Sequence, residues 1–137
     1  MIRGKIVTIS GPVVDCEFPT GKLPKIREAL TVPVNGTERT MEVAQHIGGG
    51  TVRCIMLAES ENLARGMEVT AKGTGIQVPV GPCTLGRMFD VLGRPIDGKG
   101  EIPQNVAKWE IHRKAPNFED QRPVAEILET GIKVIDL

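Results

Sequence analysis

The chain has 137 residues and a mass of 14.8 kDa, which is room for one ordinary domain, or for one small domain and part of a second. Gly (16) and Pro (10) together make up about a fifth of the residues, against an average of about 12%, which excludes a helical bundle or a coiled coil. Lys plus Arg (17) equals Asp plus Glu (17) and aromatic residues make up only 3%, so both the basic excess and the stacking side chains typical of a nucleic-acid-binding protein are missing.

The N-terminal part is predicted to form short strands separated by turns. Apolar and acidic residues alternate from Val14 to Phe18, which is the two-residue period of a half-buried strand. Residues 6–9 form an apolar strand before it, and Gly11-Pro12 separates the two.

A β-hairpin is predicted between Thr31 and Ala44. Its turn is Asn35-Gly36, because both positions tolerate positive φ. Pro33 has no N–H to give to a ladder, so we expect it at an edge or a bulge.

Three further strands are predicted after the break at Gly48–Gly50, at Thr51–Leu57, Met67–Thr70 and Ile76–Val80. Six or seven strands within about 80 residues indicate a small closed or nearly closed β-barrel, since closure removes exposed edges.

The pattern changes after Val80. An apolar stretch at 85–92 is followed by a turn-rich loop at 93–100, and 101–122 shows little periodicity and is expected to be extended or irregular.

A helix is predicted to start at Pro123, since a first-turn N–H has no helical partner. Val124, Ile127 and Leu128 would lie on one apolar face, and Gly131 would supply the cap. Because four of the last six residues are apolar, we expect the chain to be cut from a longer domain.

The cysteines and histidines do not form a metal-ligand pattern. Cys16, Cys54 and Cys83 are odd in number and far apart, which favours reduced thiols in a cytosolic protein over a disulfide framework. Neither His46 nor His112 has a second ligand at a suitable spacing, so no metal site is predicted.

Gly93–Gly100 matches G-x-x-x-x-G-K, the core of a phosphate-binding loop. The next residue should be a Ser or Thr that holds magnesium, but Gly100 stands there, and Pro95 removes an N–H from the supposed cradle. Gly48–Gly50 lacks both the Lys and the Ser. We therefore interpret both segments as turns.

No catalytic, cofactor-binding or metal-binding residue is predicted within this chain. Ser10 and Ser60 are the only serines, and neither lies in a G-x-S-x-G elbow. The longest uncharged stretch, 73–86, is too short and broken to span a membrane, and the N-terminus shows no pattern of a signal or transit peptide.

The most informative residues form a series along the whole chain. In chain order they are Gly4-Lys5-Ile6-Val7, Gly11-Pro12-Val13-Val14-Asp15, Gly48-Gly49-Gly50-Thr51-Val52-Arg53, Val78-Pro79-Val80-Gly81, Thr84-Leu85-Gly86-Arg87, Asp90-Val91-Leu92-Gly93-Arg94-Pro95-Ile96-Asp97, Ile111-His112-Arg113-Lys114-Ala115-Pro116 and Leu128-Glu129-Thr130-Gly131-Ile132-Lys133-Val134-Ile135-Asp136-Leu137. In order and spacing this series resembles the N-terminal part of the catalytic beta subunits of F-type ATP synthases.

Two positions separate this resemblance from its relatives. The alpha subunit typically has Ala where Val134 stands and a Gly soon after the pair that matches Ala115-Pro116, whereas Asn117-Phe118-Glu119 follows here, as in beta. Vacuolar-type and flagellar-type ATPases share the Leu-Gly-Arg element but lack the Gly-Pro-Val-Val-Asp opening in this form.

The resemblance implies a mainly β fold. Residues 1–76 would be an N-terminal six-stranded β-barrel for ring assembly, and 77–137 the incomplete start of an α/β P-loop nucleotide-binding domain. The family's phosphate-binding loop, catalytic glutamate and adenine contacts come after the position of Leu137, so we expect this chain alone neither to bind nor to hydrolyse ATP.

For the parent protein the resemblance implies ATP synthesis or hydrolysis coupled to proton transport, with Mg-ATP or Mg-ADP bound. The partners would be alternating alpha subunits and the central stalk, on the cytoplasmic side of a bacterial inner membrane, without direct membrane insertion. Two alternatives stay open: a segment of a related rotary or secretion ring ATPase, and a free-standing β-barrel interaction module.

Overall fold

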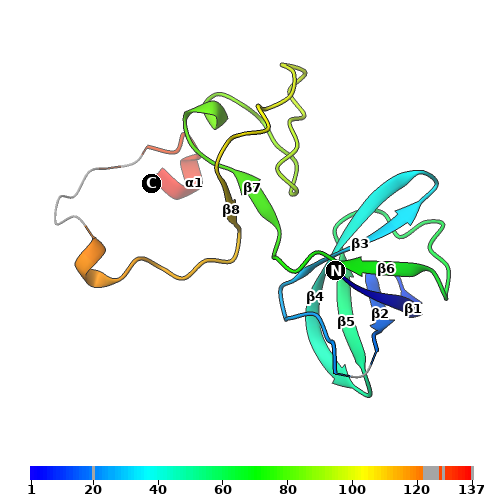
Figure 1. The fold of residues 1–137 in the computed structure, drawn as a ribbon. Coiled ribbons are helices and arrows are strands. Elements are labelled where there is room, and N and C mark those ends of the chain that lie inside the picture. The colour runs from blue at the N-terminus through cyan, green and yellow to red at the C-terminus, as the bar shows by residue number, and fades with distance from the viewer. Residues whose placement is uncertain (20, 122–126, 128, 137) are drawn as a thin grey trace.

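The computed structural model describes residues 1–19, 21–121, 127 and 129–136. Six strands close into a barrel in the order β1-β2-β5-β4-β3-β6, and all neighbouring pairs are antiparallel (Figure 1). These strands are β1 (Ile2–Ser10), β2 (Val13–Glu17), β3 (Ala29–Val34), β4 (Thr37–Gly48), β5 (Thr51–Met56) and β6 (Glu68–Ala71). The prediction of a mainly β chain with a six-stranded barrel is confirmed.

The barrel interior is filled by side chains that alternate along the strands. On β5, for example, Val52, Cys54 and Met56 are buried, whereas Arg53 and Ile55 between them are exposed. All six strands contribute, and the core consists of Ile6, Val14, Cys16, Phe18, Leu30, Val32, Val34, Met41, Val43, Val52, Cys54, Met56, Val69 and Ala71.

At Gly4 the backbone of β1 packs directly against a core side chain, with no space for a Cβ atom. It stands on β1 opposite Val69 of β6, and the ring of Phe18, itself only 3% exposed, packs against it. A side chain here would meet both that ring and the backbone of β2.

The predicted hairpin is confirmed. β3 and β4 pair from Val34↔Thr37 onward, and the turn residues Asn35 and Gly36 have φ values of 50° and 79°. Pro33 is exposed and lies beyond Thr31, the last residue of β3 that pairs with β6, so the edge prediction is also confirmed.

The strand predicted at Ile76–Val80 exists but is not part of the barrel. It forms β7 (Gln77–Pro79), which pairs with β8 (Lys108–Glu110) in a separate two-stranded sheet. The physical reason is that β6 already pairs with both β1 and β3, so the closed barrel has no edge left for another strand. β8 lies in the segment expected to be extended or irregular.

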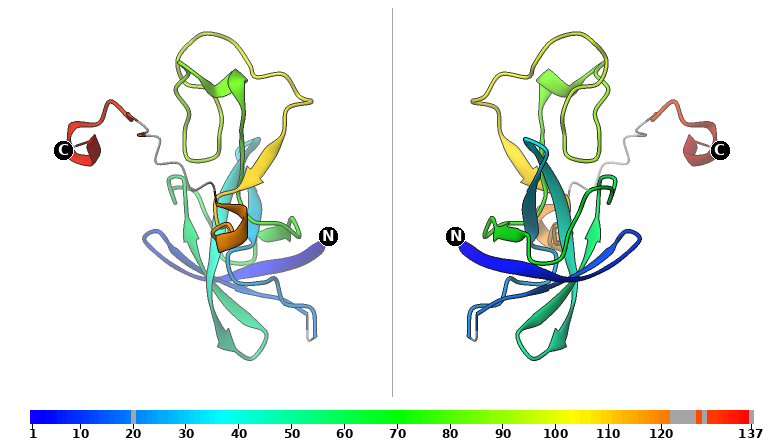
Figure 2. Two further views of the ribbon diagram at one scale, coloured as in Figure 1. Left: turned by 90° about the vertical axis from the view of Figure 1, so that its left-hand side faces the viewer. Right: turned by 90° about the vertical axis from the view of Figure 1, so that its right-hand side faces the viewer.

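The remaining elements are short. They are η1 (Pro82–Thr84), η2 (Phe118–Asp120) and α1 (Lys133–Asp136), and Figure 2 shows the loop between β7 and β8 extending away from the barrel. The helix predicted from Pro123 lies mostly outside the described residues, and its described members 127, 129 and 130 are in no helix. In the described part of the chain, no helix has the length and apolar character needed to cross a membrane.

Candidate functional site: the junction between the barrel and the segment that follows it

The chain leaves the barrel along a path fixed by one buried carboxylate. Glu28 is 6% exposed, and its two oxygens accept hydrogen bonds from the backbone N–H groups of Lys25 and Gly73, both at 2.8 Å. Two backbone hydrogen bonds flank this contact, from Lys72 N to Ala29 O at 3.1 Å and from Ala29 N to Thr74 O at 2.9 Å. Glu28 therefore ties the loop before β3 to the exit from β6.

The two-stranded sheet is attached to this exit by polar contacts. The N–H of Gly75 donates to Glu110 at 3.1 Å, and the N–H of Ile111 donates to Ile76 O at 3.0 Å. Nε2 of His112 lies 3.1 and 3.3 Å from the two carboxylate oxygens of Glu42 on β4. β8 is thus linked to the barrel wall as well as to β7.

The loop between β7 and β8 is organised around one ion pair. Arg87 donates from Nε and Nη2 to the two oxygens of Asp97 at 2.6 and 3.0 Å, and the same carboxylate accepts the N–H groups of Met88 and Lys99. The Arg87 guanidinium, helped by the two backbone N–H groups, holds the pKa of Asp97 well below its usual range. The carboxylate in turn raises the pKa of Arg87.

This loop contains the residues of the apparent phosphate-binding pattern. The ammonium group of Lys99 donates to Gly86 O at 3.0 Å, and Asp90 accepts the N–H groups of Leu92 and Arg94 at 2.9 and 2.8 Å. Residues 101–107 after the pattern are not helical. The pattern therefore lies in a surface loop in which Lys99 is bonded to a carbonyl oxygen of the same loop, and no helix N-terminus follows it to face a phosphate. Both observations agree with the interpretation of this segment as a turn.

The other residues considered as site candidates lie apart from one another. Gly48–Gly50 make the turn between β4 and β5, with φ values of 93°, 60° and 82°. Nε2 of His46 lies 2.7 Å from Pro24 O, on the barrel. Ser10 ends β1, and Ser60 is in the loop after β5. Within the described ranges, no three His, Cys, Asp or Glu side chains are placed to hold a metal ion.

The three cysteines are free thiols. Cys16 and Cys54 are buried in the barrel core, where the neighbouring Cys16 and burial raise the pKa of Cys54. Cys83 is half-buried in η1, with its Sγ 3.9 Å from Val80 O. A buried thiol with a raised pKa is inert, so Cys54 is a packing residue.

One ion pair lies on the outer barrel wall. Arg53 on β5 donates to both oxygens of Asp15 on β2 at 2.8 and 2.9 Å, directly across the strand pair. These hydrogen bonds hold the pKa of Asp15 below its usual value. This pair could not be predicted from the sequence, because the register between β2 and β5 places Asp15 opposite Arg53, and that register is not visible in the sequence.

The barrel also matches a known family. Residues 6–73 match the family model described as ATP synthase alpha/beta family, beta-barrel domain. Residues 6–73 are a β-barrel domain of the ATP synthase alpha/beta family. The matched residues begin within β1 and end two residues after β6, so the match coincides with the closed barrel. Proteins of this family are subunits of ATP-hydrolysing ring ATPases.

The alpha/beta-family barrel is followed by a segment with many exposed apolar side chains. Leu85, Met88, Val91 and Ile96 are 79%, 60%, 61% and 57% exposed. They lie on the loop that Arg87 and Asp97 hold in shape. So dense an apolar surface on one loop is typical of a region that another protein segment covers.

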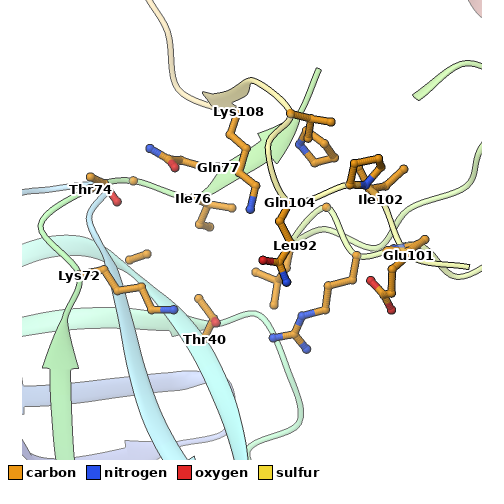
Figure 3. Close-up of a pocket in the computed structure, with 18 residues that line it drawn as sticks. Thr40, Lys72, Thr74, Ile76, Gln77, Leu92, Glu101, Ile102, Gln104 and Lys108 are labelled. Atoms are coloured by element: carbon orange, nitrogen blue, oxygen red, sulfur yellow. The ribbon is translucent and has the colours of Figure 1, made fainter. Parts of the chain in front are cut away.

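The alpha/beta-family barrel also forms one wall of a cavity that sequence reasoning did not find. Lys72 at the barrel exit and Lys108 on β8 contribute to it (Figure 3). Arg94 in the loop also lines it. The three residues come from three separate segments, so no spacing rule in the sequence could have identified the cavity.

Proposed function

We propose that this chain is the N-terminal part of the catalytic beta subunit of an F-type ATP synthase. The observation that carries the proposal is an alpha/beta-family barrel followed by beta-like residues, with Asn117-Phe118-Glu119 after Ala115-Pro116 and Val134 near the end. The parent protein would make or hydrolyse ATP at a magnesium site, coupled to proton transport, on the cytoplasmic face of a bacterial inner membrane.

In this proposal the barrel serves assembly of a hexameric ring. Its partners would be alternating alpha subunits, with the central stalk in the complete complex. The neutral net charge suits protein partners, and the outer wall exposes apolar side chains at Ile26, Ile47 and Ile55 that are 55%, 42% and 46% exposed.

Residues 77–137 would begin the nucleotide-binding domain. The exposed apolar side chains at Leu85, Met88, Val91 and Ile96 support this assignment, because the rest of such a domain would cover them. No residue of the chain is assigned a catalytic or nucleotide-binding role, and Mg-ATP or Mg-ADP would be held by later residues of the parent.

An exchange of barrels tests the proposal. Residues 1–76 of this chain replace the barrel of a complete beta subunit and, as the matched control, the barrel of a complete alpha subunit. The beta chimera is expected to form hexamers with wild-type alpha that hydrolyse Mg-ATP, and the alpha chimera is not expected to assemble with wild-type beta. The reverse outcome would assign the barrel to alpha.

A related rotary or secretion ring ATPase is the second candidate, because the family match lies on the barrel and does not separate these relatives. If neither chimera assembles, the barrel belongs to such a relative or is a free-standing interaction module. The same exchange in a vacuolar-type subunit then separates the two.

A further inference from the structure

A cavity of about 650 Å³ lies between the barrel and the segment that contains β7 and β8. Thr40 and Lys72 line it from the barrel side, Lys108 from β8, and Gln104 from the connecting loop (Figure 3). Arg94 of that loop lines it too. This volume is within the range of about 300–1,000 Å³ that is usual for small-molecule sites.

The charges around the cavity are mostly positive. Within the described part of the chain, its lining includes Lys72, Arg94 and Lys108 but only one carboxylate, that of Glu101. The ammonium group of Lys72 also lies 3.5 Å from Glu38, but the two side chains are 45% and 59% exposed, and ion pairs so accessible to water are weak. Lys72 is therefore available to a ligand.

The basic groups converge from opposite walls. Figure 3 shows the side chains of Lys72 and Lys108 reaching from different segments toward the same space, with the side-chain amide of Gln104 to one side of them. A concave site lined by one sign of charge concentrates its field, so these cations attract an anion more strongly than the same residues would on a flat surface.

We propose that this cavity binds a small polyanion with two linked anionic groups, of the pyrophosphate class. An anion charged at both ends accepts charge-assisted hydrogen bonds from both walls at once, whereas a monoanion reaches only one. Among the residues that the structure describes, no aromatic side chain lines the cavity, so a nucleobase would find no stacking partner there. The site recognises charge, and it does not depend on which ring ATPase subunit the chain belongs to.

Magnesium distinguishes this site from a P-loop. In a P-loop the metal is held together with the phosphates and supports their binding. Here Mg²⁺ would neutralise the anion before it reaches the lysines. Since Glu101 is the only carboxylate among the described lining residues, the metal would find little to bind. Excess Mg²⁺ is therefore expected to weaken binding.

The test is isothermal titration calorimetry of the 137-residue chain with sodium pyrophosphate, at low ionic strength without magnesium. We expect saturable one-site binding that Lys108→Met weakens about fivefold and Glu101→Gln strengthens about twofold. The matched control is Lys22→Met, which removes an exposed lysine that does not line the cavity and should change the affinity less than twofold.

Circular dichroism verifies that each variant is folded, and Arg94→Met replaces Lys108→Met if that variant is not. Absence of saturable binding would overturn the proposal. An equal loss in Lys108→Met and Lys22→Met would do the same, since it would show attraction to net charge alone, and so would tighter binding in the presence of Mg²⁺.

Discussion

The variant Gly4→Ala tests how tightly the barrel wall is packed. A Cβ at this position would lie 2.6 Å from the carbonyl oxygen of Glu17 and 2.8 Å from both Cδ1 and Cε1 of Phe18. The oxygen belongs to the backbone of β2, so it cannot move away without disturbing the pairing of β1 with β2. The Phe18 ring is almost completely buried and has little room to turn.

Two opposing effects set the size of the change. Forcing an extra carbon into a packed core costs about 1–3 kcal/mol, while Ala is preferred to Gly in a strand by about 0.5–1 kcal/mol. The free energy of unfolding is therefore expected to fall by about 1–2 kcal/mol. For a domain of this size that lowers the Tm by about 5–15 °C.

Thermal and urea unfolding followed by circular dichroism measure the change. Gly75→Ala is the matched control, because its added Cβ would approach a backbone oxygen less closely, with Arg27 O at 3.2 Å, and its next neighbour at 3.5 Å is the flexible side chain of Glu110. We expect it to alter the free energy of unfolding by less than about 0.5 kcal/mol. Combining Gly4→Ala with Phe18→Leu should recover part of the loss. If Gly4→Ala unfolds at the parental temperature, the packing argument is wrong.

Further predictions concern the buried and paired carboxylates. Because the pKa of Asp97 is lowered in the folded loop, its stabilisation is complete above the ordinary carboxyl pKa of about 4 and is lost as the pH falls through the folded value. Protection of the amides of residues 84–100 from hydrogen exchange should therefore decline in acid. Asp97→Asn should lack this protection at neutral pH, while the Tm of the barrel stays the same. Unchanged exchange rates in 84–100 would contradict the prediction. Arg53→Met leaves the nearly buried Asp15 carboxylate unpaired, so its Tm should lie below that of the double variant with Asp15→Val, and the opposite order would show that the pair is unimportant. Glu28→Gln places an NH₂ group against a backbone N–H and should cost about 1–3 kcal/mol in urea unfolding, whereas an unchanged midpoint would show that the carboxylate does not fix the barrel exit.

The barrel was predictable because its signals are local. The alternation at Val14–Phe18 and the Asn35-Gly36 turn each determine a short piece of structure without reference to the rest of the chain. The strand spacing alone left six or seven barrel strands open, because the pairing of β1 with β6 decides closure, and that contact joins the two ends of the barrel sequence.

β8 carried no signal of its own. Lys108-Trp109-Glu110 is only three residues long and none of the three is buried, so there is no buried face to produce a period. It is a strand because β7 supplies its partner, and Arg113 lies over the Trp109 ring at 3.7 Å. The clustering of basic groups around the cavity could not be predicted from the sequence for the same reason, since the placement of β8 brings Lys108 to the same cavity as Lys72.

The pairing of Ile2 with Ala71 has a consequence for how the chain is made. During synthesis β1 leaves the ribosome before β6. Because the pairing of β1 with β6 closes the barrel, closure cannot occur until residue 71 has emerged. The same pairing leaves both ends of the barrel one strand spacing apart, about 4.8 Å. A short linker could therefore join them, and a circular permutant opened at Asn35-Gly36 would keep every strand in place while moving the closing contact from the β1–β6 pair to the β3–β4 pair.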